Sequence, residues 1–226
     1  MKLLTDKTAL LEALGRAVRA VTSKPAIPVL NGVLLRASAD GVTVTGYDLE
    51  MAIEASMFAT LEAEGEAVLP AKQMLEIAKK LPNSDVVIEI KDGSAKIQAD
   101  RAEFTLQIMP AAEYPTLPTT DGVAVAVPGG VMWETITKVA FAAAKHDSRA
   151  FLSGVLTKIA DGNLTMVATD SFRMAVRTVP AEGELEPTIL PARFLAELAR
   201  TTGETIELIR DGSWAQAKTG RVRYLS

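Results

Sequence analysis

Short runs of alternating apolar and polar residues fill most of the chain, and four longer stretches instead show helical spacing. The short runs flank Asp-Gly pairs, which are typical of tight β-hairpin turns. These pairs stand at Asp40-Gly41, Asp92-Gly93, Asp161-Gly162 and Asp211-Gly212. The pattern therefore predicts antiparallel strands on both sides of each turn.

The helical stretches predict four helices, each with apolar residues on one side. They are expected at about 6–21, from 70, at about 131–144 and from 191. Asp6 or Thr5 can cap the first helix, and Trp133 falls on the apolar side of the third. The second and fourth begin with proline, which costs little because the first helical N–H has no partner within the helix.

The same order of elements occurs twice. Gly-Val-Leu at 32–34 returns at 154–156, and Asp48 returns as Asp170, in both cases 122 residues later. Leu-Pro-Ala-Lys at 69–72 returns as Leu-Pro-Ala-Arg at 190–193. A repeat of this period indicates one structural unit used twice. We expect domains at 1–119 and 120–226, with the proline-rich stretch 110–120 as their linker.

The second copy is shorter than the first beyond its last matching segment. Residues 101–104 return as 221–224, yet the first copy continues for about fifteen residues after Phe104 and the second for two after Tyr224. We therefore expect the second domain to be incomplete at its C-terminus and the chain to be a fragment of a longer protein, since an unfinished edge strand is a liability.

Composition narrows the possible chemistry. The 226 residues include no cysteine and one histidine, His146, so disulfides, thiolate catalysis and His/Cys metal clusters are not supported. No apolar run reaches the roughly 18 residues of a membrane span, and we expect no membrane partner and a cytoplasmic location. The net charge of −4 argues against non-specific coating of DNA by the whole surface.

Asp48 and Asp170 are the strongest candidates for acid–base catalysis, because they occupy equivalent positions. Each follows a predicted strand and precedes a turn, where aspartate commonly accepts hydrogen bonds from nearby backbone N–H groups. We prefer this structural role and expect no catalytic residue, metal or cofactor. An enzyme that uses either aspartate is the alternative. Pro128-Gly129-Gly130 is too short for a phosphate-binding loop.

Lysine and arginine residues accompany all four predicted helices. On one helix a solvated surface would explain them, but their recurrence in equivalent elements suggests a positive lining if the helices share one concave surface. Such a lining would attract phosphates without reading bases. The cations are Lys7, Arg16, Arg19, Lys24, Lys72, Lys79, Lys80, Lys138, Lys145, Arg149, Arg193 and Arg200.

A second type of site is suggested where methionine and an aromatic residue follow a predicted strand. They are either core residues or part of an adaptable peptide-binding surface. The stretch comprises Leu152, Thr169, Ser171, Phe172, Arg173 and Met174.

Several segments together resemble the bacterial sliding clamp family, the beta subunit of the DNA polymerase III holoenzyme. They are KPAIPVL at 24–30, GYDLEM at 46–51, LPAK at 69–72, MPAAEYP at 109–115 and VATDSFRMAV at 167–176. The resemblance implies an α+β clamp fold in which each domain packs two helices on antiparallel sheets. It covers the first domain and most of the second of three, and we expect the third clamp domain to be absent from this chain. In the family that the chain resembles, two full-length chains close six domains into a ring around DNA.

The resemblance also implies partners and site residues. The expected partners are double-stranded DNA without sequence preference, the polymerase III catalytic subunit, the clamp loader, other proteins with a clamp-binding motif, and a second copy in a ring. Lys24, Lys72, His146 and Phe151 match DNA contacts, although the family often has two tyrosines where this chain has Ala150-Phe151. Lys79, Lys145, Arg149, Arg193 and Arg200 complete the expected DNA-binding set. The peptide pocket is expected at Leu152, Thr169, Ser171, Phe172, Arg173 and Met174.

These expectations describe a non-enzymatic processivity factor that holds a polymerase on DNA during replication. Besides the enzyme alternative, two alternatives concern assembly. The two-domain chain could close as a trimeric ring, since three times two domains also makes six, or it could be an inactive fragment.

Overall fold

The computed structural model describes residues 1–145, 149–201 and 205–226. The chain forms two compact units, Met1–Leu117 and Pro118–Ser226. The division predicted between residues 119 and 120 lies two residues from the observed one. Within the described ranges, no helix has the length and apolar character needed to cross a membrane.

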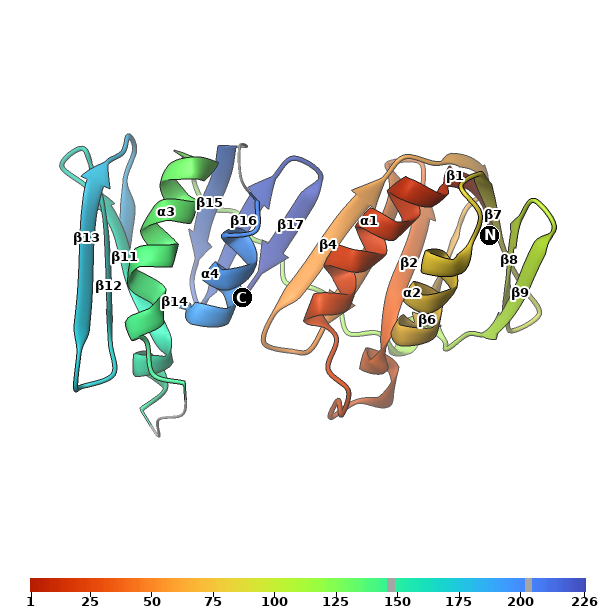
Figure 1. The fold of residues 1–226 in the computed structure, drawn as a ribbon, viewed down its shortest axis with the longest axis horizontal. Helices are drawn as coiled ribbons and strands as arrows, with labels where there is room; N and C mark the ends of the chain where they lie inside the picture. Colours follow the sequence, from red (N-terminus) through yellow and green to blue (C-terminus); the bar gives the residue numbers. More distant parts are fainter. Residues whose placement is uncertain (146–148, 202–204) are drawn as a thin grey trace. The chain divides into compact units, whose positions relative to one another are not determined.

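In the first unit, helices α1 (Lys7–Ala17) and α2 (Ala71–Lys80) lie side by side (Figure 1). Two antiparallel sheets accompany them, with strand orders β4-β3-β2-β6 and β5-β1-β7-β8-β9. The strands are β1 (Lys2–Asp6), β2 (Gly32–Ser38), β3 (Gly41–Tyr47), β4 (Ala52–Met57), β5 (Thr60–Ala63), β6 (Gly65–Pro70), β7 (Asp85–Lys91), β8 (Ser94–Ala99) and β9 (Ala102–Gln107).

The second unit has its own helix pair, α3 (Gly129–Val139) and α4 (Ala192–Leu198). Its antiparallel sheets have strand orders β13-β12-β11-β14 and β10-β15-β16-β17. The strands are β10 (Val125–Pro128), β11 (Gly154–Ala160), β12 (Asn163–Thr169), β13 (Met174–Pro180), β14 (Leu185–Pro191), β15 (Thr205–Asp211), β16 (Trp214–Thr219) and β17 (Val222–Leu225).

The two units repeat each other strand for strand, apart from β5. The order β4-β3-β2-β6 corresponds to β13-β12-β11-β14, and β1-β7-β8-β9 corresponds to β10-β15-β16-β17, while β5 has no counterpart among the described strands. Both bounds of α3 lie 122 residues after those of α1. Short 3₁₀ turns complete the pattern: η1 (Val18–Ala20), η2 (Pro28–Asn31), η3 (Ala111–Glu113), η4 (Ala140–Ala142) and η5 (Ala150–Ser153). The predicted repeat is confirmed.

The four Asp-Gly hairpins are confirmed as well, since they join β2 to β3, β7 to β8, β11 to β12 and β15 to β16. Asp92 and Gly93 have φ values of 51° and 76°, and Asp161 and Gly162 have 52° and 73°. Two consecutive residues in the left-handed region produce the turn that matches the natural twist of a hairpin.

Each helix buries one side against the sheets. Helix α1 packs against β3 and β4, and α2 packs against β2 and β6. Leu10 and Leu14, one turn apart on α1, are almost fully buried, as is Met74 on α2. Asp6 caps α1, because its Oδ1 atom accepts a hydrogen bond of 2.9 Å from the N–H of Ala9.

Three expectations about the helices were wrong. The first α-helix ends at Ala17 rather than near Val21, and the third ends at Val139 rather than near Ala144. In both, the chain tightens into a 3₁₀ turn, η1 or η4, after the α-helix. Trp133 is 44 % exposed, not packed in the core. The helical phase that buries Met132, Ile136 and Val139 turns Trp133 outward, because successive residues are about 100° apart.

The proline-rich stretch is only partly a linker. Its first half is held on the first unit by Tyr114, which is buried and donates a hydrogen bond of 3.2 Å to the carbonyl oxygen of Thr45. Burial raises the pKa of the Tyr114 hydroxyl far above its ordinary value, so that it remains a donor at any physiological pH.

The equivalent aspartates Asp48 and Asp170 each hold a tight turn, as predicted. Asp48 Oδ1 accepts hydrogen bonds from the N–H groups of Glu50 and Met51, at 3.1 and 2.8 Å. Asp170 Oδ1 accepts them from Phe172 and Arg173, at 3.1 and 3.0 Å. The residue after each aspartate has a φ near 75°, which the turn requires.

The Asp170 carboxylate is stabilised by this turn. Desolvation acts to raise the pKa of Asp170, but the two backbone N–H groups and the Arg173 guanidinium together outweigh it. The pKa therefore lies below its ordinary value.

Gly46 permits close backbone contact between helix and sheet in the first unit. A Cβ atom at this position would lie 1.9 Å from the carbonyl oxygen of Ala17, at the end of α1. Both atoms belong to the backbone or are attached directly to it, so a side-chain rotation cannot relieve the overlap. Glycine is required here by the lack of space.

We expect Gly46→Ala to destabilise the first unit by about 3 kcal/mol, at the upper end of the usual cost of overpacking a core. The α1 helix would have to move away from β3 and lose part of its buried contact. The free energy of unfolding in urea, followed by circular dichroism, measures the change.

Gly15→Ala is the matched control, because a Cβ atom at Gly15 on the same helix has no neighbour within 4 Å. It should stabilise the protein by about 0.5–1 kcal/mol through reduced freedom of the unfolded chain. Equal effects of the two substitutions would contradict the packing argument.

The Asp170 turn predicts a specific acid sensitivity. Because the folded-state pKa is below the ordinary value of 3.8, the ionised carboxylate contributes stability above that pH and loses it as the pH falls through the folded-state pKa. Asp170→Asn, which cannot ionise, should therefore be less stable than the wild type at neutral pH. The difference should shrink below about pH 4. Urea unfolding across this range is the measurement, and a difference that does not vary with pH would refute it.

Candidate functional site

The exposed sides of α2 and α4 carry cations at matching places. Lys72 lies in the first turn of α2 and Arg193 in the first turn of α4, and both are exposed. Lys79 is exposed near the end of α2, and Arg200 follows α4. These four residues, predicted from the sequence to face DNA, are thus placed on the solvent side of the helix pair in their own unit.

Carboxylates accompany two of these cations. Lys79 Nζ lies 2.7 Å from Glu76 Oε1, and Arg200 Nε lies 3.5 Å from Glu197 Oε1. An exposed pair such as Lys79–Glu76 contributes little to stability, and its carboxylate is easily exchanged for another anion. The Lys79 contact also holds the pKa of Glu76 below its ordinary value, mainly through the hydrogen bond and then through the charge.

The remaining predicted DNA contacts lie in loops. Lys24 is exposed between η1 and η2, and Lys145 is exposed after η4. Phe151 is 58 % exposed on η5. Arg149 donates a hydrogen bond of 3.0 Å to Ser171 Oγ, so that it contacts the other predicted site. His146 lies outside the described residues.

An apolar groove lies on the sheet of the second unit, in the region predicted to bind peptides. Its volume is about 230 Å³. Leu152 and Thr169 line it, as predicted from the sequence, together with Phe151, which was predicted to contact DNA. The full lining is Phe151, Leu152, Gly154, Leu156, Val167, Thr169 and Ile189. Such a groove can accept apolar side chains of an extended peptide.

Sequence reasoning missed Leu156, Val167 and Ile189. Leu156 pairs with Val167 on β12 and with Ile189 on β14, so the three side chains lie on one face of the sheet. A signal was present, because both Val155 and Leu156 are apolar. Adjacent strand residues point to opposite faces, and this pattern indicates apolar residues on both.

The Asp170 turn presents aromatic and thioether side chains beside the groove. Thr169 Oγ1 accepts a hydrogen bond of 3.1 Å from the N–H of Ser171 and donates one of 2.8 Å to the carbonyl of Arg173. The tight turn leaves Phe172 98 % exposed and Met174 69 % exposed. An apolar residue so exposed is available to a partner.

Arg173 is held within the second unit. Its Nε atom donates to Asp170 Oδ2 and its Nη2 atom donates to the carbonyl oxygen of Phe141, both at 2.9 Å. Its guanidinium carbon lies 5.6 Å from the centre of the Phe141 ring. This residue connects the turn to η4, which directly follows α3; residues 129–142, which comprise both, are called the α3 segment. Arg173 therefore shapes the predicted peptide site.

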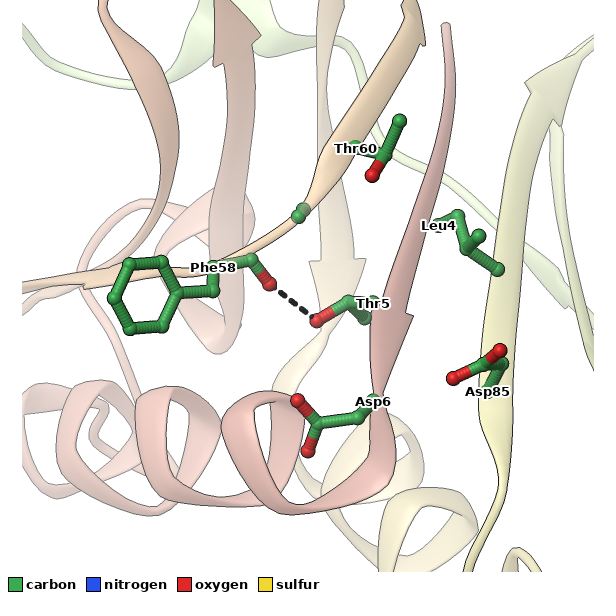
Figure 2. Close-up of a pocket in the computed structure, with 7 residues that line it drawn as sticks. Leu4, Thr5, Asp6, Phe58, Thr60 and Asp85 are labelled. Carbon is green, nitrogen blue, oxygen red and sulfur yellow. Dashed lines mark hydrogen bonds between the residues drawn. The ribbon is translucent and has the colours of Figure 1, made fainter.

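A second cavity, of about 390 Å³, opens on the first unit beside β1 (Figure 2). Phe58, Asp6 and Asp85 line it, and Thr5 Oγ1 donates a hydrogen bond of 2.6 Å to the Phe58 carbonyl oxygen. Asp6 already caps α1. Sequence reasoning placed no site residue here. Across the part of the chain that the structure describes, no group of three His, Cys, Asp or Glu residues could hold a metal ion.

Comparison with known families matches both units. Residues 1–118 match the profile of the DNA polymerase III beta subunit, N-terminal domain. Residues 126–219 match that of the DNA polymerase III beta subunit, central domain. The two matches follow the order of the units along the chain.

Relatives and solved structures agree with these matches. The chain is 32 % identical to the beta sliding clamp of Streptomyces coelicolor, over 95 % of this chain and 59 % of that protein. It is 33 % identical to that of Bacillus subtilis, over 92 % and 59 %. A crystal structure of the Bacillus subtilis DNA polymerase sliding clamp superposes with a TM-score of 0.95 and 30 % identity, over 100 % of this chain and 64 % of that one.

The chain therefore spans about three fifths of the length of these relatives. The sequence profiles, the fold and the order of the domains all agree. The chain belongs to the DNA polymerase III beta subunit family and contains its N-terminal and central domains.

Proposed function

We propose that this chain acts as part of a sliding clamp, a processivity factor that encircles duplex DNA and tethers the replicative polymerase. Membership of the beta subunit family in both units is the observation that carries the proposal. In this role the protein catalyses no reaction. Its contribution is topological, because a closed ring cannot leave the duplex sideways.

The exposed cations on the helices suit such a ring. Lys72 and Arg193 project to solvent at equivalent places in the two units and can meet phosphates. Contacts to phosphates carry no sequence information, so they allow movement along DNA. The proposed DNA-binding set also includes Lys24, Lys79, Lys145, His146, Arg149, Phe151 and Arg200.

Ring closure is proposed to involve further domains and a second copy. The relatives are longer than this chain, and a ring of six clamp domains requires partners beyond the two units described. Repeated units suit head-to-tail closure, in which each unit presents one surface to the next. We propose that the ring operates in the cytoplasm, where bacterial DNA is replicated.

The groove on the second unit is the proposed docking place for short peptides of the polymerase III catalytic subunit, the clamp loader and other clamp-binding proteins. Apolar lining, the exposed Phe172 and the flexible Met174 support this role. Methionine adapts its shape to different apolar partners, which suits a surface shared by several proteins. Ser171 and Arg173 are proposed to fix the turn that frames the groove.

Reversing two helix charges tests the DNA-binding set. Lys72→Glu combined with Arg193→Glu should weaken duplex binding and reduce the slope of log K against log salt by about two, since each lost phosphate contact removes roughly 0.9. Binding is measured by fluorescence anisotropy of a labelled duplex at several salt concentrations.

The matched control is Lys91→Glu combined with Lys158→Glu. It changes the net charge equally at two exposed lysines on strands. This control should leave the salt slope nearly unchanged. Equal slopes for both double variants would show that total charge, not the helix positions, governs binding.

Phe172→Ala tests the peptide groove. It should weaken binding of a clamp-binding peptide by about 1.5–3 kcal/mol, the range for burying a large apolar side chain. The folded chain should keep its stability, because Phe172 is 98 % exposed. Val123→Ala, at a side chain 87 % exposed, is the control. Peptide affinity unchanged in Phe172→Ala would exclude this residue from the docking surface.

A further inference from the structure

Two aromatic side chains stand on the solvent side of the α3 segment. Trp133 is 44 % exposed and Phe141, on η4, is 60 % exposed. Thr137 is also exposed, four residues after Trp133 on α3 and four before Phe141 in the sequence, and the three residues are called the aromatic stripe. The opposite side, with Met132 and Ile136, supplies the buried contacts.

The equivalent stripe in the first unit has no aromatic residue. Positions 122 residues earlier are Leu11, Gly15 and Arg19, on α1 and η1. Both helices pack against equivalent strands, so the fold does not need aromatic rings at these places. The aromatic pair is therefore a property of the second unit's surface.

Cations surround the aromatic stripe. Glu134, next to Trp133, accepts contacts from two of them, Lys138 Nζ at 2.6 Å and Arg177 Nη2 at 2.9 Å. Arg173 lies over the Phe141 ring. The shared carboxylate leaves one positive charge in excess beside Trp133.

The residues around the aromatic stripe also carry a net positive charge. Residues 129–151 carry three cationic side chains and two carboxylates in the sequence, and Arg173, Arg177 and Asp170 contact one another or this segment from the sheet side. The region is thus net positive in a chain whose total is −4. The positive charge favours an anionic ligand. The exposed rings of Trp133 and Phe141 favour a ligand with flat apolar faces that can stack on them.

Single-stranded nucleic acid meets both requirements. Its phosphates pair with cations and its unpaired bases stack on aromatic side chains without regard to sequence. A duplex offers the phosphates alone, because its base faces are covered by neighbouring base pairs. An apolar peptide offers apolar groups for the rings but no negative charge, so it would leave the cations without an anionic partner.

We propose that Trp133 and Phe141 form a stacking site for unpaired bases of single-stranded nucleic acid. The inference rests on the proposed function, in which the helices face DNA. It adds that the second unit engages the unpaired strand next to a duplex, while the first unit contacts phosphates alone.

Tryptophan fluorescence provides a direct test. The chain has two tryptophans, so Trp214→Phe leaves Trp133 as the reporter, and Trp214 is half-buried on β16. Titration with oligodeoxythymidylate at low salt should quench Trp133 fluorescence in a saturable manner. A blunt-ended duplex at the same phosphate concentration should leave the fluorescence nearly unchanged.

Affinity measurements in the full chain give the second readout. Trp133→Leu, which introduces the residue found at position 11, should weaken binding to oligodeoxythymidylate by roughly tenfold and leave duplex binding within about twofold. Trp133→Phe should retain most of the affinity because it keeps an aromatic face. Thr137→Ala, within the aromatic stripe, should bind as the wild type does.

Three outcomes would overturn the proposal. They are unchanged oligonucleotide affinity in Trp133→Leu without quenching, equal losses for single strand and duplex, or quenching by a clamp-binding peptide in place of the oligonucleotide. The salt slope of duplex binding reports on the helix lining separately. A normal slope with no Trp133 effect refutes the stacking site alone, whereas a duplex affinity independent of salt refutes the proposed function.

Discussion

The packing of helices on antiparallel sheets is the interaction on which the rest of each unit depends. A helix can bury only one side in this arrangement, and the depth of burial is set by backbone contact where Gly46 meets the end of α1. Leu10 and Met74 then fill the space between the layers. Everything that the helix pair offers to a partner must come from the opposite side, and there both units carry lysine or arginine at the start of the second helix.

Local rules were sufficient for much of the fold. Asp-Gly pairs predicted the hairpins because these residues readily form a tight turn without help from tertiary contacts, as the positive φ values at Asp92-Gly93 and Asp161-Gly162 illustrate. The repeat predicted equivalent elements because each landmark recurs at a nearly constant separation. The roles of Asp48 and Asp170 followed from their place between strand and turn. Each of these features depends on a few neighbouring residues.

The misses depend on tertiary contacts instead. Trp133 is large and apolar, which suggests a position in the core. The buried residues Met132 and Ile136, however, determine which side of α3 faces the sheet, and Trp133 is not on that side. Tyr114 lies among prolines, yet its hydroxyl reaches a strand carbonyl 69 residues away in sequence. The groove residues Leu156 and Ile189 meet only through strand pairing. None of these contacts is encoded within a short window of sequence.

The same turn has been adapted differently in the two units. In the first, the position three residues after Asp48 is Met51, which is buried and anchors the turn in the core. In the second, the equivalent residue is Arg173, which is exposed and donates a hydrogen bond to the carbonyl oxygen of Phe141. This exchange ties the turn to the α3 segment. The residue before it is exposed in both units, Glu50 in the first and Phe172 in the second, so the turn itself sets that exposure. A scaffold fixed by backbone hydrogen bonds can thus change its surface without changing its path.

Carboxylates next to the helix cations fit the proposed sliding role for a physical reason. Glu76 and Glu197 each lie beside a cation that would otherwise bind phosphate more firmly. A ring that already encloses DNA gains nothing from tight contacts, because topology prevents dissociation and strong binding would only slow its movement. Cations that are partly neutralised keep the attraction weak and easily exchanged. Under this view the net negative charge of the chain and its positive helix surfaces are compatible, since the first limits stray binding and the second guides the duplex through the ring.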